Sequence, residues 1–314
     1  MRIPGFKKRS RLILVAVSIL AVVLASLGLM RALKKPPPGS EPLITLYLSA
    51  EDRVIELGLE EYLVGTVAAE MPADFGLEAL KAQAVCARTY AVRKIIEGRD
   101  YPRGAHLTDD INNCQAYVSG DEFARRNPAN YRELWSKIEK AVQATRGIIM
   151  VYDQQPIDAL YHSTCGGKTE SALASTGKDI PYLRSVSCQY CQASRYYESQ
   201  QVFSPQQLQN LIKEKPDDKI SLKITSRTPA GRVSRLEVNG QSLYAETFRR
   251  WLGLPSTWWN LSLDEGYLVV NSRGYGHGLG MCQYGAGGMA AAQKSYKQIL
   301  QHYYQHIELL SLNY

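Results

Sequence analysis

The chain has 314 residues, of which 45% are hydrophobic and 21% are charged, a balance that is typical of globular proteins and excludes a mainly disordered chain. Its formal net charge is +7, and residues 1–35 hold eight of the lysines and arginines and no acid. The remaining residues carry 29 basic and 30 acidic side chains. Because this body is nearly neutral, it offers no basic surface for a polyphosphate, and nucleic acid is excluded as a partner.

The N-terminal region has the pattern of a membrane anchor. Leu12–Met30 is a run of 19 uncharged residues, long enough to cross a bilayer as one helix. More basic residues precede the run than follow it, which favours a cytoplasmic tail over residues 1–11. Residues 31–42, with three consecutive prolines, are expected to form a linker, and residues 43–314 an extracytoplasmic domain. A cleaved signal peptide is the alternative, but the run is long for one and no A-x-A site follows it.

The first half of the body alternates short strands with helices. Residues 43–58 predict strands, and residues 59–69 predict a helix whose end carries Glu70, because Pro72 disfavours helical geometry at Met71. Apolar residues at three- and four-residue steps predict a second helix over residues 77–96, ended by Gly98. A third helix is expected from Tyr131 and is closed by Gly147.

The second half is richer in strands. The expected strands cover residues 148–152, 157–163, 220–225, 232–238, 242–245 and 267–270. Asn239-Gly240 predicts a tight hairpin, and Ser204-Pro205 predicts the start of a helix that runs through Ile212. A glycine-dense loop over residues 274–288 and a helix through Tyr304 complete the chain. This irregular order favours an α+β fold, with mixed helices and antiparallel strands around a substrate cleft.

Glu70 is the candidate acid/base. Val67, Ala68, Ala69 and Met71 surround it in sequence with apolar groups, and desolvation raises the pKa of a carboxyl toward the range that a general acid needs. On the following helix, Lys81, Gln83 and Arg88 are candidates for binding an anionic or hydroxyl-rich substrate. The alternative is a structural Glu70 that ends its helix and pairs with Arg88.

Two glycine-rich turns supply further candidates. His162 and Ser163 precede Gly166-Gly167, and His277 lies between glycines in a loop that also holds Gln283. Glycine lets backbone and ligand approach each other closely. A single histidine is usually structural, but two histidines that both lie in such turns favour a substrate site.

The six cysteines of the chain could bind a metal ion, form disulfides or remain free thiols. Cys188 and Cys191 have the spacing of a zinc-binding pair, and Cys165 with His162 would complete a structural zinc site. A disulfide and free thiols remain open alternatives. Cys114 with His106 lacks the partners for a second site.

Four motifs then carry a resemblance to a known family. They are Ala68-Ala69-Glu70-Met71-Pro72, Ala87-Arg88-Thr89-Tyr90-Ala91, His162-Ser163-Thr164 with Gly166-Gly167, and Gly276-His277-Gly278 with Gln283-Tyr284-Gly285-Ala286. In this order they resemble the stage II sporulation protein D family over residues 43–305. The resemblance also implies a substrate-facing Tyr90. Some members have a Cys/His zinc cluster near residues 108–117, and this chain departs from that pattern.

The resemblance implies a lytic transglycosylase that cuts denuded peptidoglycan strands during engulfment of the forespore, with Glu70 as acid/base and no catalytic cofactor. It implies as partners the glycan strands, a membrane-anchored amidase/endopeptidase and a multispanning membrane scaffold. Three rival functions remain: a non-catalytic enhancer of a cell-wall amidase, a cysteine peptidase that uses Cys165 or Cys282 with His277, and a zinc amidase that uses His162 and His277.

Overall fold

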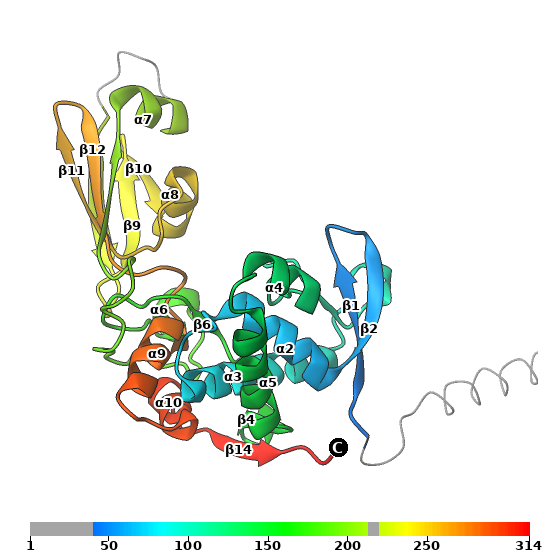
Figure 1. Ribbon diagram of the computed structural model, residues 1–314. Coiled ribbons are helices and arrows are strands. Elements are labelled where there is room, and N and C mark those ends of the chain that lie inside the picture. The colour runs from blue at the N-terminus through cyan, green and yellow to red at the C-terminus, as the bar shows by residue number, and fades with distance from the viewer. Residues whose placement is uncertain (1–39, 213–219) are drawn as a thin grey trace, which may run out of the picture. The chain divides into compact units, whose positions relative to one another are not determined.

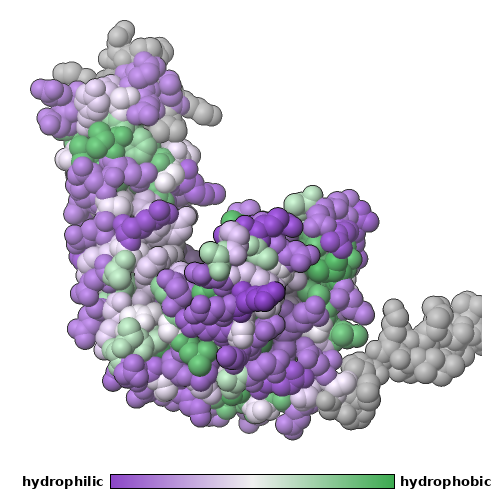
Figure 2. Space-filling view, in the orientation of Figure 1, coloured by the Kyte–Doolittle hydropathy of each residue, from purple (hydrophilic) through white to green (hydrophobic). Residues whose placement is uncertain are grey.

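The computed structural model describes residues 40–212 and 220–314 (Figure 1). The expected tail and anchor at residues 1–30, and most of the linker, lie outside these ranges. Within the described ranges, no helix combines the length and apolar character needed to cross a bilayer. Ile44–Leu312 form one compact unit, whose visible face is mostly hydrophilic with small apolar patches (Figure 2).

One long helix organises the part of the fold that carries Glu70. The helix α3 (Leu77–Glu97) packs against α2 (Leu59–Glu70), α5 (Tyr131–Ala144), α9 (Gln283–Ala291), α10 (Tyr296–Tyr303) and β4 (Ile148–Tyr152). Its alanines are buried, and these small side chains allow close approach of so many neighbours. Gly98 ends α3 in the left-handed conformation with φ of 64°, as expected of a C-terminal glycine. The three predicted helices of this half are confirmed.

Two small sheets flank these helices. Strand β1 (Leu43–Leu48) lies between β2 (Arg53–Gly58) and the short parallel β3 (Leu107–Thr108). Strand β4 lies between β5 (Gln155–Pro156) and β14 (Glu308–Ser311), both antiparallel to it. The helix α4 (Gly120–Arg126), which the sequence pattern did not reveal, precedes α5.

The prediction of one long strand over residues 157–163 is wrong. Only Tyr161–His162 form a strand, β6, which pairs in parallel with the equally short β13 (Met281–Cys282). Residues 157–160 make only isolated bonds to strands: the N–H of Ile157 bonds to the Met150 carbonyl of β4, and the Leu160 carbonyl accepts the N–H of Met281, the first residue of β13. The β6–β13 pair joins two segments more than 100 residues apart in the chain.

The region from residue 199 to 272 has its own core. Its two antiparallel sheets have the orders β10-β9-β8 and β11-β12-β7, and α8 (Ala245–Leu252) contributes Phe248 to the core against Trp259. The strands are β7 (Ser199–Phe203), β8 (Leu222–Arg227), β9 (Val233–Val238), β10 (Gln241–Tyr244), β11 (Trp259–Asp264) and β12 (Tyr267–Ser272), with α7 (Pro205–Ile212) after β7. Asn239 and Gly240 both have positive φ in the β9–β10 turn, which confirms the predicted hairpin.

The glycine-dense segment is partly helical, contrary to the expectation of a loop through residue 288. Helix α9 begins at Gln283, and the Cys282 side chain caps it by accepting the N–H of Gly285. A side chain at Gly285 would meet the Tyr303 hydroxyl at 2.0 Å. Glycine is required here by tight packing around a helix, which sequence pattern alone does not separate from loop flexibility. Overall, the described chain is α+β, as predicted.

Candidate active site

A cavity of about 540 Å³ collects the candidate residues that the sequence separates. Its wall includes Glu70 from the end of α2, Tyr161 and His162 from β6, His277 from the glycine-rich loop, and Gln283 from the start of α9. The segment between β3 and α4 closes another side through residues 111–115. Among the described residues that line this cavity, Glu70 is the only carboxylate.

The environment of Glu70 favours its protonated form. Glu70 is the last residue of α2, because Met71 takes an extended conformation before Pro72. Burial desolvates the carboxylate and raises the pKa of Glu70, while hydrogen bonds from the Ala116 N–H and the Tyr161 side chain oppose this rise. The Ala116 N–H lies 2.7 Å from Oε1. Desolvation outweighs the two donors, as a general acid requires.

Gln283 ties α9 to the end of α2 that carries Glu70. Its Nε2 donates to the backbone carbonyl of Glu70 at 2.8 Å and to Gln83 Oε1 at 3.3 Å. Gln83 is fully buried, so it acts through Gln283 and has no exposed surface for a ligand. The structure thus brings Gln83 next to the cavity as a positioning residue.

The two histidines meet across the β6–β13 pair. Their ring centroids are 5.6 Å apart. Nδ1 of His162 bonds to the Leu279 carbonyl at 3.0 Å, and its buried Nε2 has no hydrogen-bond partner. His277 bonds through Nε2 to the Tyr161 carbonyl and through Nδ1 to the N–H of Leu279, both at 3.0 Å. With Nδ1–H donating, the buried His162 Nε2 is an acceptor without a hydrogen-bond partner among the described residues.

Burial favours the neutral form of both histidines. Desolvation is the main cause that lowers the pKa of His162 well below its usual value, and the neighbouring His277 and Arg232 lower it further. Desolvation also lowers the pKa of His277, although part of that side chain is exposed. Because both nitrogens of His277 are engaged with the protein, it is poorly suited to bind a catalytic zinc, which counts against a zinc amidase.

The other predicted substrate contacts divide into two groups. Tyr90 and Ser163 line the cavity. Lys81 does not line it, and its Nζ bonds to Glu78 at 2.6 Å.

The prediction that Arg88 binds the substrate is wrong, because this side chain is fully buried. It forms a two-pronged ion pair with Glu60, at 2.8 and 2.5 Å. It also donates to the carbonyls of Ile148 and Val142, so it joins α2, α5 and β4. The alternative pairing of Arg88 with Glu70 is therefore also wrong.

The sequence interpretation missed Tyr161, Gln115 and Ala116. The Tyr161 hydroxyl oxygen lies 2.9 Å from Gln115 Oε1, and Gln115 Nε2 donates to the Tyr62 hydroxyl at 3.2 Å. Tyr161 immediately precedes His162, but it lies before the glycine-rich turn on which the selection of His162 and Ser163 was based. The contact of Ala116 is a backbone contact, which no side-chain pattern reveals.

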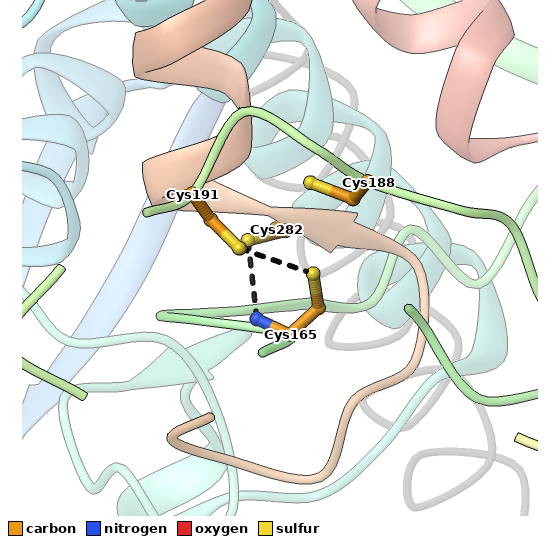
Figure 3. Close-up of side chains that lie close together, drawn as sticks. All are labelled: Cys165, Cys188, Cys191 and Cys282. Carbon is orange, nitrogen blue, oxygen red and sulfur yellow. Dashed lines mark hydrogen bonds between the residues drawn. The ribbon is translucent and has the colours of Figure 1, made fainter. Parts of the chain in front are cut away.

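Four cysteine sulfurs form a second cluster (Figure 3). Cys165, Cys188, Cys191 and Cys282 are buried, and their sulfurs all lie within 4.8 Å of one another. The predicted trio is brought together, but the expected fourth member, His162, is replaced by Cys282. Because Cys165 and Cys282 are both inaccessible, neither is placed to attack a substrate, which counts against a cysteine peptidase.

Fold and cavity together define an α+β protein in which the desolvated carboxylate of Glu70 and two histidines line one cavity. The family described as Stage II sporulation protein matches residues 47–152, a range that includes Glu70. Stage II sporulation protein D of Bacillus subtilis (strain 168) is 38% identical over 265 residues, covering 83% of this chain and 77% of that protein. Its counterpart in Bacillus amyloliquefaciens is 37% identical over 277 residues, covering 88% and 80%.

The chain therefore belongs to the stage II sporulation protein D family. A more distant relative is the amidase enhancer of Bacillus subtilis (strain 168), which is 27% identical over 304 residues. That match covers 79% of this chain but only 40% of the enhancer.

Proposed function

We propose that this protein is a lytic transglycosylase that cuts denuded peptidoglycan glycan strands, with Glu70 as the acid and then the base. The observation that carries the proposal is a desolvated Glu70 that is the only carboxylate lining the described cavity. Hydrolytic glycosidases usually need a second carboxylate, either as nucleophile or to activate water. A lytic enzyme does not, because a hydroxyl of the substrate replaces water.

The first step is proton donation. The Ala116 N–H holds Oε1 of Glu70, which favours the proton on Oε2, since a backbone N–H bonds best to an oxygen that carries no proton. That proton passes to the glycosidic oxygen as the bond from this oxygen to the anomeric carbon breaks. The leaving sugar departs as an alcohol, and positive charge develops on the remaining ring.

The second step closes a ring within the substrate. The Glu70 carboxylate takes the proton of the C6 hydroxyl, whose oxygen bonds to the anomeric carbon and forms the 1,6-anhydro end. Glu70 regains its proton, and no water is consumed. The same side chain thus serves first as acid and then as base, as the acid/base residue of a retaining glycosidase also does.

The remaining wall suits an uncharged, hydroxyl-rich ligand. Tyr90, Ser163 and the 111–115 segment supply polar groups to its lining.

We propose that this reaction takes place at the outer face of the cell membrane, together with two partner proteins. Residues 12–30 would anchor the protein by one pass, with an extracytoplasmic catalytic body that acts in engulfment. A membrane-anchored amidase/endopeptidase would supply strands free of stem peptides, and a multispanning membrane scaffold would hold both proteins. The distant similarity to an amidase enhancer supports one rival, a glycan-binding protein that does not cut.

The test compares Glu70→Gln with Glu61→Gln on denuded strands, with anhydro-ended products measured by mass spectrometry. Glutamine keeps the size and the Ala116 contact but carries no transferable proton, so Glu70→Gln should lower the rate by ~10²–10⁴-fold. Glu61 is an exposed residue of the same helix, and its variant should retain the parent rate.

Strand binding separates the two functions. Under the proposal, Glu70→Gln still binds denuded strands in a pull-down but releases no anhydro ends. An unmodified chain that binds strands, produces no anhydro ends and accelerates an added cell-wall amidase would instead establish the enhancer function. Products with reducing ends would show hydrolysis and contradict the lytic mechanism.

A further inference from the structure

We propose that Cys165, Cys188, Cys191 and Cys282 bind one zinc ion in a closed, structural four-thiolate site. The residues come from three segments: Cys165 follows β6, the pair Cys188 and Cys191 lies in the loop between α6 (Ala172–Thr176) and β7, and Cys282 ends β13. Figure 3 shows the four side chains converging on a common centre. This inference does not depend on the activity proposed above.

The spacing of the sulfurs fits a tetrahedral ion better than a disulfide. All four sulfurs lie within 4.8 Å of one another, and those of Cys165 and Cys191 are 3.5 Å apart. Zinc–sulfur bonds of ~2.3 Å in a tetrahedron place the sulfurs about 3.8 Å from each other. The observed separations lie around that value, whereas a disulfide requires one pair at about 2.05 Å.

The surroundings supply donors to charged sulfurs. The N–H groups of Cys165 and Gly285 lie 3.2 Å from the Cys282 sulfur. The N–H of Gly167 reaches the Cys165 sulfur at 3.4 Å, and the Tyr303 hydroxyl lies 3.1 Å from that of Cys188. Such donors distribute the negative charge that thiolates bring to a metal site.

A buried cation, which also interacts with the buried Glu170, offsets part of the remaining charge. Four thiolates with one zinc ion leave two negative charges in a dry interior, which need compensation. Arg232 is only 2% exposed, donates to the Cys165 carbonyl at 3.0 Å, and is close enough to Cys165 and Cys282 to interact with their charge. The Nε of Arg232 has no hydrogen-bond partner among the described residues.

Glycines let the segments close around the cluster. A side chain at Gly285 would come within 2.6 Å of the Cys188 sulfur, and one at Gly288 within 2.1 Å of the Tyr190 carbonyl. Both clashes involve the 188–191 loop where it packs on α9. The loop therefore reaches its place only because α9 presents glycine at these two positions.

The position of the site suits a role in holding the cavity wall together. Cys165 lies three residues after His162, and Cys282 directly precedes Gln283, so the ion would hold together both strands that form the wall near Glu70. All four cysteines are at most 1% exposed. A site with four protein ligands and no open position is structural and not catalytic.

The experiment measures metal in the full chain, expressed in zinc-containing medium and purified under reducing conditions without a metal-affinity resin. We expect about one zinc per chain by mass spectrometry of the metal, and release of that zinc when a mercurial reagent titrates the thiols. Cys165→Ser and Cys282→Ser should lose the zinc. Cys114→Ser, outside the cluster, should keep it.

Two measurements decide the matter even if a serine variant fails to fold. Cobalt substitution of the unmodified chain should give the intense visible bands of tetrahedral thiolate coordination. Alkylation without reductant, followed by peptide mass mapping, should find no disulfide among the four cysteines. A metal-free chain with a disulfide in this cluster, or stoichiometric iron in place of zinc, would overturn the proposal.

Discussion

At Glu70, burial and hydrogen bonding have opposite effects on the pKa of the carboxyl group. The protein removes water from the carboxylate, which raises the pKa of Glu70, and then returns part of the lost stabilisation through the Ala116 N–H and Tyr161. The net effect is a raised pKa. Tyr161 is the adjustable part of this balance, because its hydroxyl can be removed without changing the shape of the ring.

Tyr161→Phe should shift the pH dependence of strand cleavage. The Tyr161 hydrogen bond favours the charged carboxylate and lowers the pKa of Glu70, so its loss raises that pKa further. The general acid then stays protonated to higher pH, and the alkaline limb of kcat/KM moves upward. Profiles of the parent, Tyr161→Phe and Tyr90→Phe test this, because Tyr90 lines the same cavity without bonding to Glu70. A downward or absent shift in Tyr161→Phe contradicts the assignment.

Among the elements, the β6–β13 pair has the greatest influence on the site. It spans two residues on each strand, yet it joins the segments of both histidines and of Gln283. Gly280 stands directly before β13 with φ of 65°, and a Cβ there would lie 1.9 Å from the Leu160 carbonyl. The pair can form only because position 280 has no side chain.

Gly280→Ala should therefore destabilise the protein more than Gly240→Ala. Both glycines have positive φ, but Gly240 has nothing within 4 Å of its missing Cβ. The hairpin variant carries only the backbone penalty of about 1–2 kcal/mol. The Gly280 variant adds an overlap with backbone, and we expect a further loss of ~1–3 kcal/mol. Urea unfolding of the two variants measures the difference, and equal losses would show that β13 accommodates the side chain.

On the scale of the whole molecule, the described elements form one unit that does not include the N-terminal region. Every helix and strand of the described ranges lies between Leu43 and Ser311, and Ile44–Leu312 form a compact unit. The visible face of this unit is mostly hydrophilic (Figure 2). The eight basic residues that produce the positive net charge all precede residue 36.

Removal of residues 1–38 should leave a soluble, folded protein. The deletion takes away the proposed anchor and the positive excess but no described strand or helix, so the midpoint of thermal unfolding should match that of the full chain in detergent. Size-exclusion chromatography and a thermal scan check this expectation. Aggregation of the shortened chain would show that the boundary removes residues on which the fold depends.

Sequence alone determined the elements whose signals are local. The stripe of α3, the Asn239-Gly240 turn and the helix end at Glu70 were all predicted correctly, because periodicity, glycine and proline act within a few residues. Glu70, His162, His277 and Gln283, which the sequence selected as site candidates, line one cavity. Motifs in glycine-rich turns and at a helix end made that selection possible.

Tertiary structure decided every feature that depends on distant neighbours. Arg88 has the spacing of an exposed binding residue, yet its partner Glu60 lies on another helix, and only packing shows that the pair is buried. Cys282 reaches Cys165 across 117 positions of the chain, and the two-residue strand β6 exists because β13 lies beside it. Such contacts follow from how elements pack, and no short stretch of sequence contains both partners.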